Sequence, residues 1–113
     1  MEAGFPLAVA AAEVNTAAAG YAPEDMWVIA TDLRQLPDVF VNVAMALRTY
    51  AQRLEGDYPI HPQVVEAIGQ LYTGLGQLAT AAQEIEPLFR GVHAEDLKRE
   101  EAPRVNEQAW NVR

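Results

Sequence analysis

Residues 62–92 read PQVVEAIGQLYTGLGQLATAAQEIEPLFRGV, and the fold prediction rests mainly on this segment. Apolar or small residues recur in it at alternating steps of four and three, which is the spacing of a heptad repeat. These positions are Val64, Ile68, Leu71, Leu75, Leu78, Ala82, Ile85, Phe89 and Val92. The spacing predicts one long helix over residues 62–92 with a single apolar stripe, which Pro87 bends near its end.

A second run with the same alternation precedes it, at Met26, Ile29, Leu33, Leu36, Phe40, Val43, Leu47, Tyr50 and Leu54. We expect a helix over residues 23–55 that is kinked at Pro37, because a proline inside a helix costs about 3 kcal/mol. Gly56, Asp57 and Pro59 lie between the two runs and stop helices. Since the runs are equally long and the turn is short, they predict an antiparallel helical hairpin over residues 23–102.

The two ends of the chain differ from the hairpin in composition. Residues 1–22 are rich in alanine, and Pro6 and Gly20 bracket a short helix that buries little area. A last short helix is expected over residues 94–101, followed by a C-terminal tail over 103–113. The fold class that follows is all-α, a helical hairpin with a short N-terminal helix.

The expected hairpin is too long for a compact domain of this size. A helix over residues 62–92 is roughly 46 Å long, whereas a compact chain of 113 residues has a diameter of roughly 34 Å. A hairpin also buries only one stripe on each helix, so we expect it to complete a three- or four-helix bundle. The simplest way is a homodimer, and the alternative is a helical protein partner.

Composition limits the partners and the compartment. The formal net charge is −8, and no basic patch offsets it, so direct binding to nucleic acid is not expected. The chain contains no cysteine, which suits a reducing compartment, and we expect a cytoplasmic protein. We expect no targeting signal and no membrane span, since Glu13 interrupts the first apolar run.

The residue types that carry chemistry are sparse. Serine and cysteine are both absent, which removes the commonest nucleophiles. His93 and Asp96 could offer two metal ligands from one helix face, but exposed polar residues are the simpler interpretation. Neighbouring carboxylates such as Glu84 and Glu86 are expected to be solvated. We therefore expect no enzyme, no catalytic residue, no metal or other cofactor, and no small-molecule substrate.

Two sets of residues are candidates for an interface. Ala67, Gly74 and Ala81 recur every seven positions, and helical glycine is costly enough to suggest that another helix approaches closely there. The aromatic ring of Phe89 is expected in a core or an interface. In the tail, Trp110 with Val105 and Val112 either docks in the groove of a partner or folds back onto the hairpin.

Three segments resemble a group of small uncharacterised helical proteins of actinobacterial conjugative and other mobile elements. They are DLRQLP at residues 32–37, EPLFR at 86–90, and HAEDL at 93–97 followed by Pro103, Arg104 and Trp110. The resemblance runs from the second helix onward and includes no catalytic motif. It implies an accessory or adaptor role and no assigned activity.

Two other functions stay open. The hairpin, the acidity and the lack of cysteine also resemble the WXG100 proteins that type VII secretion exports. The turn at residues 55–59 has no Trp-x-Gly motif, however, and the export pattern Tyr-x-x-x-Asp occurs only at Tyr21 to Asp25. The acidic surface could instead belong to a regulator that blocks a DNA-binding protein by mimicking DNA.

Overall fold

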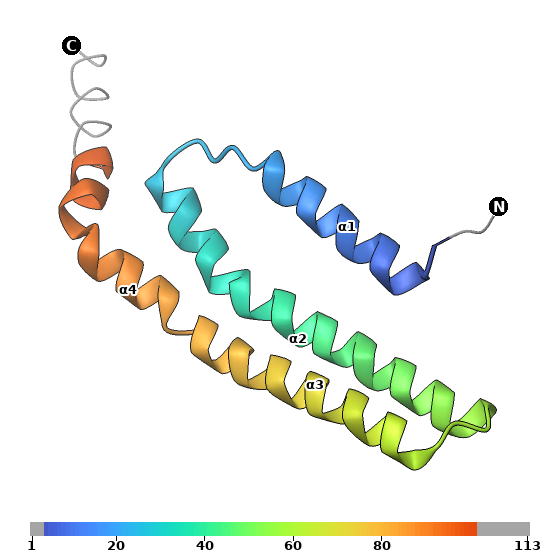
Figure 1. Cartoon of the computed structure of the whole chain (residues 1–113). Helices are drawn as coiled ribbons and strands as arrows, with labels where there is room; N and C mark the ends of the chain where they lie inside the picture. The colour runs from blue at the N-terminus through green and yellow to red at the C-terminus, as the bar shows by residue number, and fades with distance from the viewer. Residues whose placement is uncertain (1–3, 102–113) are drawn as a thin grey trace, which may run out of the picture.

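The computed structural model of the chain describes residues 4–101, and within these residues the only regular elements are helices (Figure 1). Four helices follow one another: α1 (Pro6–Ala19), α2 (Met26–Asp57), α3 (Pro62–Ala82) and α4 (Ile85–Val92). Residues 94–101 are helical as well. The all-α prediction is confirmed, and α2 and α3 form the antiparallel hairpin that dominates the molecule.

Local sequence signals set the ends of the hairpin helices. The Asp25 carboxylate accepts a hydrogen bond of 3.0 Å from the backbone N–H of Val28 and so caps the start of α2. At the start of α3, the ring Nδ1 of His61 accepts a hydrogen bond of 3.0 Å from the N–H of Gln63, and Pro62 occupies the first turn. The turn between the two helices therefore lies at residues 58–61, close to where glycine and proline predicted it.

Pro37 lies inside α2, which continues through it to Asp57. The predicted kink at Pro37 stays a prediction. An interruption occurs in the other arm of the hairpin, where residues 83–84 separate α3 from α4. The single helix predicted over residues 62–92 is therefore two helices. Pro87 explains the position of the break, because its ring crowds the carbonyl of the residue four places earlier, which is Gln83, and offers it no N–H.

The two long helices contact each other along a line that differs from the predicted one. On α2, Ala30, Pro37 and Ala51 are buried, whereas Val43 is exposed. On α3 and α4, the positions turned inward recur at steps of three and four, and we call this row the inner seam: Val65, Ile68, Tyr72, Leu75, Ala79, Ala82, Glu86 and Phe89. Four of the nine positions predicted on α3 and α4 lie on the inner seam, and the other five are exposed, since alternate positions lie outside the contact. Small side chains at a helix contact let the two axes come close together.

Residues 93–100 return to the start of α2. The N–H of Met26 donates to the Glu100 carboxylate at 2.9 and 3.1 Å, which also places a negative charge at the positive end of α2. The indole Nε1 of Trp27 donates to the Leu97 carbonyl at 3.3 Å, and the Arg90 guanidinium lies 5.7 Å from the centre of the Trp27 ring. Leu97 is 4% exposed, so this contact fixes residues 93–100 on the hairpin.

The molecule is long and thin, with principal extents of 74 × 34 × 18 Å and a radius of gyration of 20.8 Å. A compact chain of this length would have a radius of gyration of about 13 Å. The buried apolar residues among those described are Ala30, Ala51, Ala79, Ala82 and Leu97. The core is thus a narrow line of small side chains rather than an enclosed interior.

Candidate interaction surfaces

The described part of the chain exposes many large apolar side chains. On α3 and α4 they are Val64, Leu71, Leu78, Ile85, Leu88 and Val92, with exposed fractions from 39% to 69%. On α2 they include Val39, Val41, Val43 and Met45. Large apolar side chains that gather on an exposed face are typical of a binding surface.

A second apolar surface lies between α1 and α2. The two helices run side by side with a gap between them, and none of the residues of α1 is buried (Figure 1). The gap contains a cavity of about 410 Å³ near Phe5, Val14 and Leu47 and another of about 630 Å³ near Ala18 and Leu36. Helix α1 therefore packs only loosely against α2.

Two contacts hold α1 in this position. At its start, the rings of Phe5 and Tyr50 have their centres 5.4 Å apart in a tilted arrangement. After its end, the Tyr21 hydroxyl donates a hydrogen bond to the Asp32 carboxylate. This hydrogen bond holds the proton on the phenol and raises the pKa of Tyr21 above its ordinary value, with desolvation and the charge of Asp32 adding to the effect.

The interface residues predicted from the sequence differ from one another in how far they are exposed. Ala67 and Ala81 are exposed, Gly74 is half-buried, and nothing lies within 4 Å of the position that a Cβ on Gly74 would take. Phe89 is half-buried on the inner seam, with its ring 4.8 Å from that of His93. The remaining candidates, Val105, Trp110 and Val112, lie outside the described residues. The role of all these residues stays a prediction.

The polar candidates form a small ion-pair cluster. His93 Nδ1 lies 3.0 Å from Asp96 Oδ2, and Arg99 donates to Asp96 Oδ1 at 3.1 Å. The hydrogen bond from His93 lowers the pKa of Asp96, and the positive charge of Arg99 favours the same direction. His93 and Asp96 thus bond to each other, and the described residues contain no group of three side chains suited to a metal. The other histidine, His61, caps α3.

One carboxylate that we expected to be solvated has partners instead. The Glu86 side chain is 13% exposed and lies between two arginines, with Arg34 Nε at 3.4 Å and Arg90 Nη1 at 3.3 Å from the same oxygen. The spacing of four residues between Glu86 and Arg90 is typical of an ion pair on one helix face, so this contact could be predicted from the sequence. The contact with Arg34 could not be predicted in this way, because Arg34 lies 52 positions away.

Comparison with known proteins adds no relative to these observations. No protein-family model, no curated protein and no solved structure matches the chain. Among residues 4–101, no helix combines the length and apolar character needed to cross a membrane. The exposed apolar faces are therefore the features on which a function can be argued.

Proposed function

We propose that this protein is a non-enzymatic helical interaction module that associates with itself or with another helical protein. The observation that carries the proposal is the burial pattern. Among the described residues no large side chain is fully buried, while sixteen large apolar side chains are exposed. A helical chain with half its residues hydrophobic normally encloses them. A partner helix or a second copy would cover the faces left open here.

The accessible surface area of the chain is larger than that of a compact monomer, which supports the proposal. The chain exposes 8853 Å², whereas a compact monomer of the same mass exposes about 6100 Å² by the usual scaling. The difference is roughly 2700 Å². Obligate dimers bury about 2000 to 5000 Å² in total, shared between two chains. Two chains together carry an excess of roughly 5400 Å², which slightly exceeds the upper end of this range.

A sequence resemblance suggests the biological setting of this module. The resemblance of residues 32–37 and 86–97 to small helical proteins of actinobacterial mobile elements favours an accessory or adaptor role in such a system. We place that role in the cytoplasm, in keeping with the lack of cysteine. The net charge of −8 favours a protein partner over nucleic acid.

Light scattering after size exclusion, over a range of micromolar concentrations, tests the proposal. A dimer or higher species, with a urea midpoint that rises with protein concentration, supports self-association. A monomer that unfolds with low cooperativity supports a helical partner protein instead. A monomer that unfolds cooperatively, with a midpoint independent of concentration, would refute the proposal because it would show that the hairpin is complete alone.

A second candidate is a small exported hairpin of the WXG100 kind. The observation that favours it is the elongated antiparallel pair of α2 and α3, which dominates the structure (Figure 1). A tagged copy expressed in a host with type VII secretion would appear in the culture medium. Retention of the tagged protein in the cells would reject this candidate.

A further inference from the structure

Helices α3 and α4 carry a second heptad row beside the inner seam. On α3 its positions alternate by three and four residues: Val64, Ala67, Leu71, Gly74, Leu78 and Ala81. The same phase continues on α4 with Ile85, Leu88 and Val92. We call this row the outer seam. Since the inner seam already contacts α2, the outer seam is an additional apolar stripe that a single hairpin does not use.

The large members of the outer seam lie open to solvent. The exposed fractions are 48% for Val64, 60% for Leu71 and 52% for Leu78. Helix α3 spans 21 residues and contains one charged side chain, Glu66. A helix face in permanent contact with water usually carries several charges, so the composition of α3 indicates that both of its apolar faces are covered.

From Val64 to Ile85, large and small side chains alternate along the outer seam, and this alternation selects an orientation. When two identical helices pair in antiparallel orientation, each first heptad position of one helix meets the other apolar position of the partner helix. About a two-fold axis near Gly76, Leu71 then faces Ala81 of the second copy. In the same arrangement Leu78 faces Gly74 of the second copy, and Ile85 faces Ala67. Each of these layers combines one large side chain with one small one, whereas the end layer places Val64 against Leu88.

A parallel pair would lack this complementarity. It would place Leu71 against Leu71 and Gly74 against Gly74 of the second copy, so that crowded layers would alternate with empty ones. Uneven filling of this kind leaves cavities, and each cavity costs stability. The sequence of α3 therefore fits an antiparallel copy of itself better than a parallel one.

The charges beside the outer seam also fit a second copy. Glutamines recur every seven residues along one flank, at Gln63, Gln70 and Gln77, and Glu84 follows them in phase. In the antiparallel register Gln77 lies beside Gln77 of the second copy, and Gln70 lies beside Glu84. Two chains that each carry a net charge of −8 would repel if carboxylates met here. This flank instead pairs amide with amide, or amide with carboxylate.

From these observations we infer that the outer seam binds a second copy of this chain in antiparallel orientation, about a two-fold axis near Gly76. The inference rests on the proposed function and names its face, partner and orientation. An isologous contact of this kind closes on itself, so the product is a dimer rather than a filament. The excess surface of roughly 2700 Å² per chain belongs to the whole molecule, and the outer seam would bury part of it in a dimer of this type.

Introduced cysteines test the orientation, because the chain has none of its own. The full chain is made with Gln77→Cys or with Gln63→Cys, and each variant is oxidised at a micromolar concentration. We expect Gln77→Cys to form a covalent dimer and Gln63→Cys to stay reduced, since residue 63 lies far from its own copy in the antiparallel arrangement. Equal cross-linking of both variants, or of neither in a chain that dimerises, would overturn the inference.

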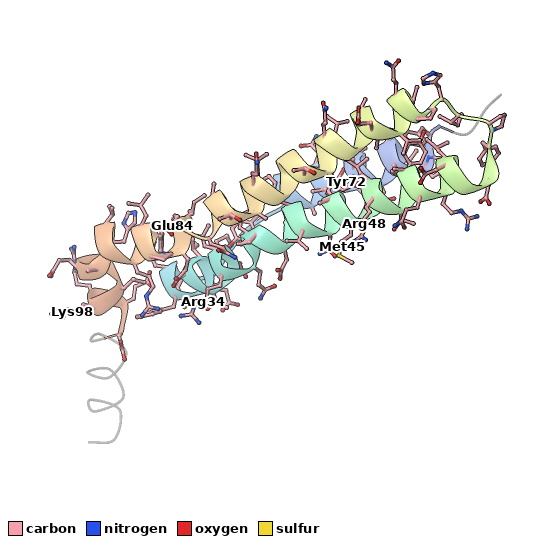
Figure 2. All side chains as sticks on the ribbon, turned by 90° about the horizontal axis from the view of Figure 1, so that it is seen from below. Arg34, Met45, Arg48, Tyr72, Glu84 and Lys98 are labelled. Atoms are coloured by element: carbon pink, nitrogen blue, oxygen red, sulfur yellow. The ribbon has the colours of Figure 1, made fainter. Side chains whose placement is uncertain are left out.

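Charge substitutions test the face. Leu71→Glu should weaken dimerisation by a factor of about 100 or more, because two carboxylates would be buried in one apolar contact. Met45→Glu is the matched control, since Met45 is 59% exposed, against 60% for Leu71. Met45 belongs to α2 (Figure 2) and lines a hollow with Tyr72 and Gly76 of α3, neither of which belongs to the outer seam. Dimerisation that survives Leu71→Glu would overturn the inference and leave the proposed function intact. A wild-type chain that is monomeric and cooperatively folded would refute both.

Discussion

Replacing Leu97 with alanine tests whether the contact between residues 93–100 and the start of α2 stabilises the molecule. Leu97 is the one large residue among the buried apolar residues of the described chain, at 4% exposed, and its carbonyl accepts the hydrogen bond from the Trp27 indole. Removing a buried leucine side chain costs about 2 to 5 kcal/mol. We expect the lower part of this range, about 2 to 3 kcal/mol, because the end of a thin molecule can partly close the space.

This loss is a large share of the stability of an ordinary domain, which is about 5 to 15 kcal/mol. For a chain of this length it corresponds to a melting temperature lower by about 8 °C or more. Urea unfolding followed by circular dichroism gives the free energy of unfolding, and the fluorescence of Trp27 reports on the contact itself. The measurement uses a Trp110→Phe background so that Trp27 is the sole indole.

Met45→Ala is the control, because an exposed side chain should change the free energy of unfolding by less than about 0.5 kcal/mol. We expect Leu97→Ala also to speed amide exchange over residues 94–101, since these residues would lose their anchor. An unchanged urea midpoint together with unchanged Trp27 emission would refute the reasoning. It would mean that residues 93–100 do not hold the start of α2.

Three further predictions concern the hairpin, α1 and the ion-pair cluster. Ala79→Leu should lower the free energy of unfolding by about 1 to 3 kcal/mol, measured with urea, because Ala79 is 5% exposed where α3 meets α2. Asp32→Asn should return the pKa of Tyr21 towards its ordinary value of 10.0 in an ultraviolet titration. In the native chain the raised pKa means that this contact stabilises α1 below the unfolded-state pKa of the phenol and is lost as the pH rises through the folded-state value. The lowered pKa of Asp96 has the opposite sign, so its stabilisation is present above the unfolded-state pKa and is lost as the pH falls through the folded-state value. His93→Ala should move the Asp96 midpoint, followed by NMR, back up towards 3.8.

Signals that act over one helical turn explain what could be predicted. Pro6 and Gly20 bracket α1, and the predicted range of residues 6–19 agrees with its bounds. Pro62 begins α3 in the same way. These residues act through their own backbone torsions and through hydrogen bonds to near neighbours, so the surrounding structure has little influence on them.

The phase of the hairpin contact could not be predicted by the same means. Leu71 and Leu75 both belong to a stripe of apolar residues that is wider than one helix contact, and periodicity alone treats them as equivalent. The structure separates them, because Leu75 is half-buried on the inner seam and Leu71 is 60% exposed. The distinction depends on where alanines allow α2 and α3 to approach, which is a property of the pair of helices. The hydrogen bond from Met26 to Glu100 joins residues 74 positions apart, so local sequence patterns could not predict it either.

The positions at which α3 contacts α2 differ from the predicted ones, and this difference bears on where apolar surface is buried. A hairpin that uses Ala30, Ala51 and Ala79 at its internal contact buries little apolar area, and at about 25 cal/mol per Å² it gains little from closing. Larger side chains such as Leu71 and Leu78 lie on the opposite edge of the stripe and are exposed. If the outer seam binds a second copy, as we propose, their burial adds free energy on association that the hairpin alone does not gain. Folding and assembly would then be coupled, so the stability of the chain should rise with its own concentration.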